Sequence, residues 1–107
     1  MEKQKSKSTP YQIGANQERK AMEWFQNVYA RYIIRSAGSH TPVDFIAGNG
    51  EQVFVVQVKY GKRPQEVDEE VLCEWAMQFN AIPVVMEKRR GGRWKAHFID
   101  GTEEIFE

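Results

Sequence analysis

Polar side chains interrupt two neighbouring apolar runs near the middle of the chain. Asp44 lies within Val-Asp-Phe-Ile, and Gln57 and Lys59 lie within the second run. Carboxylate and carboxamide oxygens are ligands for hard divalent cations, and an ammonium group can neutralise a phosphate. If the three side chains converge, they form a site for a cation and a phosphate. Each has a plainer interpretation alone: Asp44 could cap a turn, and the other two could line the solvent face of a strand.

Both runs are typical of β-strands. Residues 43–47 and 53–60 are rich in β-branched and aromatic side chains. Gly48-Asn49-Gly50 separates them, and Asn-Gly between two such runs is the strongest short-range signal for a β-hairpin. The pairing within this hairpin decides whether the polar side chains meet.

Whether Asp44, Gln57 and Lys59 converge depends on the register of the hairpin. A loop of only two residues, Asn-Gly, would place Asp44 opposite Val55 and diagonal to Gln57. Because side chains alternate along a strand, Asp44, Gln57 and Lys59 would then share one face. A three-residue loop would shift the register and remove this convergence.

A fourth polar residue, Glu18, belongs to the first predicted helix. From Ala15 to Tyr32 apolar residues recur at helical spacing. Glu18 lies four residues before Met22, on the same face as this apolar stripe. A carboxylate that faces a core requires a partner, and a metal ion or Lys59 would serve. Pairing with Lys20 is the plainer alternative.

The rest of the chain supplies a second helix and three further strands. A short apolar run within residues 31–36 predicts the first strand. Acidic residues after Pro64 predict a helix start, and Asn80 followed by Pro83 predicts its end. Two more strands are predicted at residues 82–86 and 94–99. The order is helix, three strands, helix, two strands, which is an α/β arrangement.

Length and composition indicate one globular domain. The chain has 107 residues, 41% hydrophobic and 28% charged, which is ordinary for such a domain. Residues 1–13 are polar and lack periodicity, so we expect a flexible N-terminal arm before a single domain at 14–107. No apolar run is long enough to cross a bilayer, so no membrane partner is expected. The single cysteine, Cys73, is expected to be a packing residue, and its being alone favours a cytoplasmic protein.

Charge is balanced overall but segregated along the chain. Fifteen basic and fifteen acidic residues cancel, which by itself disfavours a nucleic-acid binder. Basic residues group at 59–63 and 88–95, whereas acidic residues gather at 66–74 and 100–107. We therefore expect a positive face beside a negative one, although each run alone is typical of solvated surface.

Four short motifs between residues 14 and 60 extend this interpretation. They are Gly14-Ala-Asn-Gln-Glu18-Arg19, Arg35-Ser-Ala-Gly-Ser39, Asp44-Phe-Ile-Ala47 and Val56-Gln-Val-Lys59. Together they resemble the archaeal-type Holliday junction resolvases of the PD-(D/E)xK nuclease superfamily. The resemblance implies a restriction endonuclease-like fold, with a central mixed five-stranded sheet, flanking helices and the order α-β-β-β-α-β-β. It also implies an endodeoxyribonuclease that depends on Mg²⁺ or Mn²⁺.

The resemblance implies catalytic roles for individual residues. Asp44 would be the central metal ligand, with Gln57 and the Val58 carbonyl beside it, and Glu18 would hold a second metal or a bound water. The metal would lower the pKa of an attacking water and offset charge on the scissile phosphate. Lys59 would orient that water or neutralise the phosphate.

The resemblance also implies contacts to DNA. Arg19, Arg35 and Ser39 would grip the backbone near the cut, with Ser39 part of the catalytic set. A guanidinium fork matches the geometry of phosphate oxygens. The remaining candidates are Lys62 and, more weakly, His40 and Lys88.

One position departs from the family's pattern. Gln57 stands where the family carries an acidic residue before x-Lys. A carboxamide oxygen can ligate a hard cation, but it brings no charge, so metal affinity should fall. Nucleases of the Mrr type look similar in carrying glutamine here. Three hypotheses therefore stand: an endonuclease that resolves four-way junctions in branched DNA, an Mrr-like general DNA endonuclease, and a catalytically inactive DNA-binding module.

The second predicted helix is apolar over a wide arc. Trp75 and Phe79 are expected in the core, yet a small sheet needs only one covered helix face. The surplus could form a homodimer surface through the second helix, with Trp75 and Phe79, similar in position to that of the resolvases. A twofold dimer would bring two active sites to one junction and let both strands be nicked symmetrically.

Overall fold

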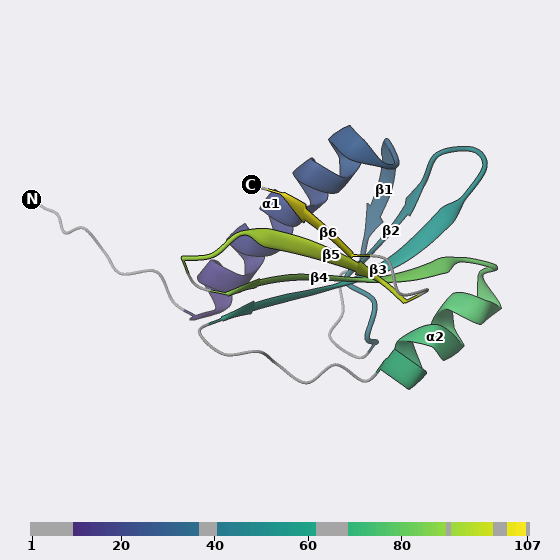
Figure 1. Cartoon of the computed structure of the whole chain (residues 1–107). Coiled ribbons are helices and arrows are strands. Elements are labelled where there is room, and N and C mark those ends of the chain that lie inside the picture. The colour runs from purple at the N-terminus through teal and green to yellow at the C-terminus, as the bar shows by residue number, and fades with distance from the viewer. Residues whose placement is uncertain (1–9, 37–40, 62–68, 90, 100–102, 107) are drawn as a thin grey trace, which may run out of the picture.

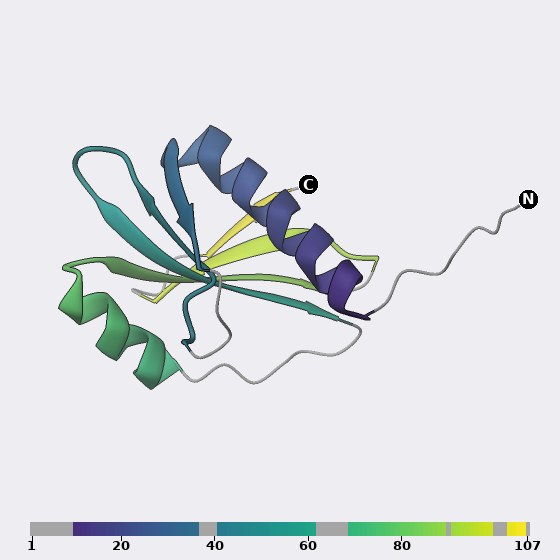
Figure 2. The same cartoon turned by 180° about the vertical axis from the view of Figure 1, so that it is seen from behind.

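A six-stranded mixed sheet separates two helices. The computed structural model describes residues 10–36, 41–61, 69–89, 91–99 and 103–106. The strands lie side by side in chain order, and only β3 and β4 run parallel. Figures 1 and 2 show the two helices on opposite faces of the sheet. The elements are α1 (Pro10–Val28), β1 (Tyr32–Arg35), β2 (Phe45–Gly48), β3 (Val53–Gly61), α2 (Glu69–Gln78), β4 (Ile82–Arg89), β5 (Trp94–Phe98) and β6 (Glu103–Phe106).

The predicted fold class is confirmed. The mixed sheet has flanking helices in the predicted order, and α2 is the crossover that two parallel neighbours require. The acidic tail, for which no strand was predicted, adds β6 at the edge beside β5. None of the described helices is both long and apolar enough to cross a membrane.

The bounds of α1 differ from the prediction at both ends. The helix begins at Pro10, so residues 10–13 of the predicted arm are helical, and the arm's residues 1–9 lie outside the described chain. Proline fits the first turn because the N–H it lacks has no partner there. The helix ends at Val28 rather than Tyr32. The Tyr29 N–H still makes a helical bond to the Phe25 carbonyl at 2.9 Å, but the Ala30 N–H donates to that same carbonyl at 3.2 Å, five residues back, which closes the helix.

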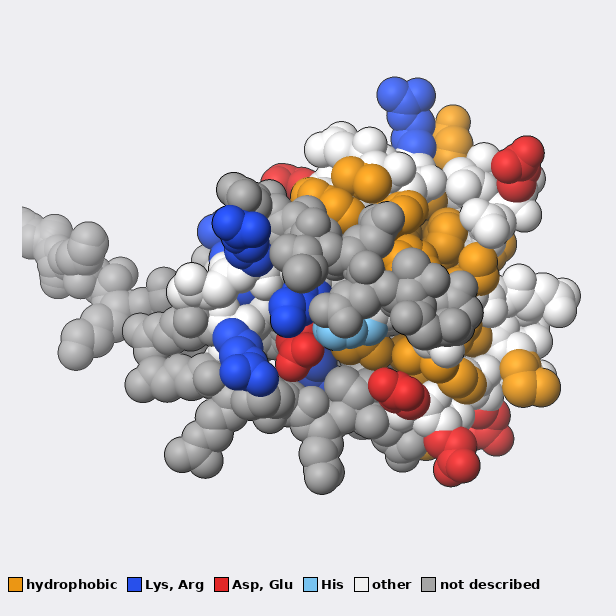
Figure 3. All heavy atoms as spheres, viewed as in Figure 1, with side chains coloured by type: hydrophobic (Ala, Val, Ile, Leu, Met, Phe, Trp, Pro, Cys, Tyr) orange, Lys and Arg blue, Asp and Glu red, His pale blue; other side chains and the backbone are white. Residues whose placement is uncertain are grey.

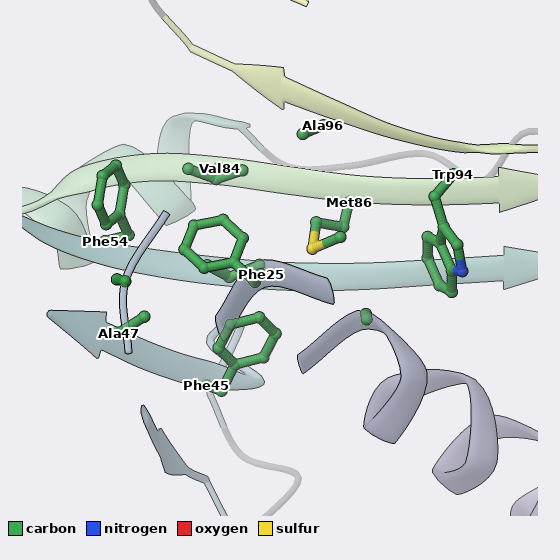
Figure 4. Close-up of a cluster of buried hydrophobic side chains, with 11 residues drawn as sticks. Phe25, Phe45, Ala47, Phe54, Val84, Met86, Trp94 and Ala96 are labelled. Carbon is green, nitrogen blue, oxygen red and sulfur yellow. The ribbon is translucent and has the colours of Figure 1, made fainter. Parts of the chain in front are cut away.

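Each face of the sheet carries its own hydrophobic cluster. On the α1 side, Phe25, Phe45 and Met86 are fully buried with Phe54 and Trp94 close by (Figure 4). The α2 side is smaller and consists of Val43, Val55, Leu72, Ala76 and Val85. We use "α1 side" and "α2 side" for these two faces. Alternation along β3 explains the division, since Phe54 and Val56 belong to one cluster and Val55 to the other.

The second helix ends as predicted. Asn80 has a left-handed φ of 51°. The N–H of Ala81 donates to the Ala76 carbonyl at 2.8 Å, and that of Asn80 donates to the Met77 carbonyl at 3.3 Å. These two bonds are those of a Schellman cap, in which asparagine can take the left-handed position. The predicted start after Pro64 lies outside the described residues.

Trp75 and Phe79 do not share one environment. Trp75 packs against the α2-side cluster, as expected. Phe79 follows the end of α2 and is 47% exposed, so the expectation that it lies in the core is wrong. Cys73 is half-buried.

The hairpin register is two residues away from the prediction. Gly48 pairs with Val53, so residues 49–52 form a four-residue loop. The side-chain oxygen of Asn49 accepts the N–H groups of Glu51 at 2.9 Å and Gln52 at 2.7 Å, and this asparagine turn replaces the tight Asn-Gly turn. A slip of two residues, unlike a slip of one, leaves every β3 side chain on its expected face.

Candidate active site

Asp44 lies at an irregularity directly before β2. Its N–H donates to the Val56 carbonyl at 2.8 Å, although Phe45 is the register partner of Val56. Two residues of this arm therefore oppose one residue of β3, as in a β-bulge. The bulge interrupts side-chain alternation: Val43 packs on the α2 side, whereas Phe45 packs on the α1 side. The predicted position of Asp44, opposite Val55 and diagonal to Gln57, is therefore wrong.

The Asp44 carboxylate nevertheless reaches the predicted partner strand. Its Oδ2 accepts a hydrogen bond from the Val58 N–H at 2.6 Å. Val58 stands between Gln57 and Lys59 on β3. The bulge thus turns Asp44 toward the backbone of β3 and brings its charge to the residue that separates the other two polar side chains.

Gln57 carries an unsatisfied oxygen. Its Oε1 is buried and has no hydrogen-bond partner within the described part of the chain. An unpaired buried acceptor costs roughly 1–3 kcal/mol, so this oxygen calls for a partner that the described residues do not supply. A cation is one partner that a carboxamide oxygen accepts.

Glu18 is held by a residue that the sequence analysis had assigned to DNA. The Nε of Arg35 lies 2.6 Å from Oε1 of Glu18, and Glu18 is the more buried of the two at 18% exposure. The expectation that Glu18 faces inward and is paired is confirmed. The expected partner was a metal ion, Lys59 or Lys20, and the structure supplies Arg35 instead.

Four charged groups act on one another around Asp44. Burial is the largest influence and raises the pKa of Asp44 above its ordinary value of 3.8. The hydrogen bond from Val58 lowers this pKa, and the negative charge of Glu18 raises it. The positive charges of Lys59 and Arg35 lower it. The candidate residues of α1, β1 and β3 therefore form one electrostatic cluster.

Comparison with known proteins identifies the family. Residues 9–105 match the family model described as archaeal Holliday junction resolvase (Hjc). The chain belongs to this family. A solved structure of Hjc from Archaeoglobus fulgidus, a Holliday junction resolvase from an archaeal hyperthermophile, is similar with a TM-score of 0.66 and 28% sequence identity. The match covers 79% of this chain and 75% of that chain.

Membership in the resolvase family supports the first of the three hypotheses. It makes the chain a nuclease that acts on branched DNA, a structure-selective junction endonuclease. The resemblance that four short motifs indicated between residues 14 and 60 thus extends over almost the whole chain.

The other described residues assigned from the resolvase pattern lie on α1 or on the α1 side of the sheet. Arg19 is exposed on α1. Lys88 lies on the α1 side, with its Nζ 5.9 Å from the centre of the Trp94 ring. Ser39, His40 and Lys62 lie outside the described residues.

A divalent cation fits the residues present. The candidate donors are the carboxylates of Asp44 and Glu18, which act on each other, and the orphaned Gln57 Oε1; all are oxygens, the ligands that hard cations prefer. Among the described residues no three His, Cys, Asp or Glu side chains gather as a metal cluster. A metal at this resolvase site would therefore depend on an amide or carbonyl oxygen beside the carboxylates.

Sequence reasoning did not find a neighbour of Lys59 on β4. The parallel pairing of β3 and β4 places Glu87 directly beside Lys59. Its carboxylate lies 3.3 Å from the Nε2 of His97. No local signal connects Lys59 with Glu87, because they are 28 positions apart in the chain and α2 lies between them.

Proposed function

We propose that this resolvase is a metal-dependent homodimer that resolves four-way DNA junctions by paired phosphodiester hydrolysis. The observation that carries the proposal is the Asp44 carboxylate bonded to the Val58 N–H, between Gln57 and Lys59. We take the site to be of the PD-(D/E)xK type, with Gln57 at the acidic position.

Asp44, the Gln57 Oε1 and the Val58 carbonyl would hold Mg²⁺ or Mn²⁺, and Glu18 would bind a second ion or a water. The raised pKa of Asp44 supports this role, because a buried carboxylate gains most from a cation beside it. When bound, such a cation lowers the pKa of a water and offsets charge on the phosphate.

Two cations of the cluster have different tasks. Lys59 would neutralise the scissile phosphate or orient the water, since it directly follows Val58 on β3 and its positive charge acts on Asp44. Arg35 positions Glu18, and a guanidinium carries five N–H donors, so it can contact Glu18 and a phosphate together. Arg19, Ser39, Lys62 and Lys88 remain proposed contacts to the DNA backbone.

Paired cutting requires two sites, and the α2 side offers an apolar surface for a second copy. Met77 is 73% and Phe79 is 47% exposed at the end of α2. Ile34, 75% exposed, pairs with Ile46, which packs on the α2 side. Exposed large apolar side chains on one side of a small domain are typical of an interaction surface. A twofold dimer would bury them and present two active sites to one junction.

Incubation with a synthetic four-way junction and with a linear duplex of the same sequence, with and without Mg²⁺, tests the proposal. Symmetric nicks in the junction alone, only with metal, are expected. Cutting of the linear duplex at a similar rate would instead support a general endonuclease. Junction binding without cleavage in Mg²⁺ or Mn²⁺ would support an inactive binding module, the alternative that the uncharged Gln57 favours.

A further inference from the structure

A polar row crosses three strands on the α2 side of the sheet. The register places Lys59 opposite Glu87, and Glu87 opposite Lys95. Residues that face each other across a ladder point to the same side of the sheet. Val85, two residues before Glu87, belongs to the α2-side cluster, so the row lies on that side. Lys95 is two strand spacings from Lys59, roughly 10 Å.

A pocket opens beside this row at the β4–β5 turn. It has a volume of about 250 Å³ and is lined by Glu87, Arg89, Gly92, Arg93 and Lys95. The turn is tight, since the Gly92 N–H donates to the Arg89 carbonyl at 2.8 Å and Gly91 has a φ of 81°. A Cβ at Gly92 would lie 3.2 Å from the Arg89 carbonyl oxygen, so a larger residue there would crowd the backbone of this turn.

The described lining of the pocket is rich in positive charge. Among the described residues three cationic side chains line it beside one carboxylate, Glu87, which His97 contacts at 3.3 Å. Figure 3 shows blue side chains gathered around the pale blue histidine and a neighbouring acidic side chain. Arg89, Arg93 and Lys95 are exposed, so an anion can reach them from solvent. Guanidinium groups match phosphate oxygens in geometry as well as in charge.

We propose that this turn pocket binds a backbone phosphate of the DNA, a short distance along the duplex from the phosphate at Lys59. The inference rests on the proposed function, because the row that begins at Lys59 leads to the pocket. The pocket makes the β4–β5 turn a second contact for the DNA arm that enters the active site. It positions the DNA and takes no part in the chemistry.

The salt dependence of junction binding tests the pocket. In metal-free buffer, where no cleavage occurs, Arg93→Gln and Arg89→Gln should each weaken binding and reduce the slope of log affinity against log salt by about 0.9, one phosphate's worth. Arg31→Gln is the matched control. Arg31 is also exposed, but it precedes β1 at the hairpin end, roughly 26 Å away along β3 at 3.3 Å per residue.

Neutral methylphosphonate linkages then locate the partner. Replacing phosphates one at a time along a junction arm should reveal one linkage whose neutralisation weakens binding by the native chain but not by Arg93→Gln. An unchanged slope in both arginine variants, or an equal loss in Arg31→Gln, would overturn the pocket as a phosphate site while native junction cleavage still stood. Absence of junction binding by the native chain would instead overturn the proposed function itself.

Discussion

The Nε of Arg35 lies 2.6 Å from Oε1 of Glu18, so a residue of β1 holds the carboxylate of α1 beside Asp44. Arg35→Lys keeps the positive charge but removes the planar fork, so it cannot serve Glu18 and a phosphate together. We expect cleavage at saturating junction to fall by about tenfold or more, with binding reduced less. Arg31→Lys, an exposed arginine outside the cluster, should cleave normally. Equal rates for the two variants would remove Arg35 from the site.

The second prediction concerns metal binding without any readout of activity. A ligand that binds only the folded chain stabilises it, by about 2.7 kcal/mol at 100 times its Kd. Mg²⁺ should therefore raise the melting temperature of the native chain, and Asp44→Asn should lose most of this gain together with cleavage, while still binding the junction. Glu51→Gln, which removes an exposed carboxylate from the hairpin loop, should keep the gain. If Asp44→Asn is stabilised as much as the native chain, Asp44 is not a ligand.

Gln57→Glu should restore a charge at the position where the resolvase pattern carries an acid. We expect the Mg²⁺ concentration for half-maximal cleavage to fall by about tenfold, because an anion next to a bound cation is worth on the order of 1 kcal/mol or more even when partly screened. Gln52→Glu adds the same charge in the exposed hairpin loop and is the matched control. A metal titration of Gln57→Glu identical to that of Gln52→Glu would count against the orphaned oxygen as a ligand.

The raised pKa of Asp44 gives the metal-free chain a defined pH dependence. Since the folded chain binds this proton more tightly than the unfolded chain, it holds more protons between pH 3.8 and the raised pKa. The contribution of Asp44 to stability is thus fully present below that window and is lost as pH rises through the raised pKa.

Urea unfolding of the metal-free chain at several pH values measures this effect. At neutral pH Asp44→Asn should be more stable than the native chain, since asparagine still has an oxygen for the Val58 N–H. The difference should shrink toward pH 3.8. A difference that does not change with pH would mean that burial of the Asp44 charge does not set its stability.

The proposed dimer can be tested at the end of α2. Phe79→Glu places a charge on the exposed apolar surface and should yield monomers in sedimentation equilibrium, with nicking of the two strands no longer paired. Gln78→Glu puts the same charge one residue earlier, on an exposed polar position, and should remain dimeric. A native chain that is monomeric at the concentrations where it makes paired nicks would contradict the α2 surface as the interface.

Local patterns were enough to predict the elements of this fold from α1 to β5, but not β6. The helical spacing of apolar residues before Tyr32 predicted α1, and the β-rich runs around Asn49 predicted β2 and β3. The end of α2 followed from Asn80, whose left-handed φ few other residues adopt easily. Spacing, capping and turn residues act over a few positions, so the sequence by itself determined the order of the elements and drew attention to Asp44, Gln57 and Lys59.

The meeting of those elements depended on contacts that no local pattern encodes. The hydrogen bonds that the Asn49 side chain accepts stabilise a four-residue loop in place of the tighter turn. A bulge directs the Asp44 carboxylate toward the Val58 N–H. Glu18 forms an ion pair with Arg35, which is 17 positions along the chain. The crossover through α2 makes β4 the parallel neighbour of β3, so that Glu87 lies beside Lys59. Such pairings are settled only when the sheet packs between its two helices, because burial then penalises each charge that lacks a partner. The tertiary structure alone therefore decided which charged residues became neighbours.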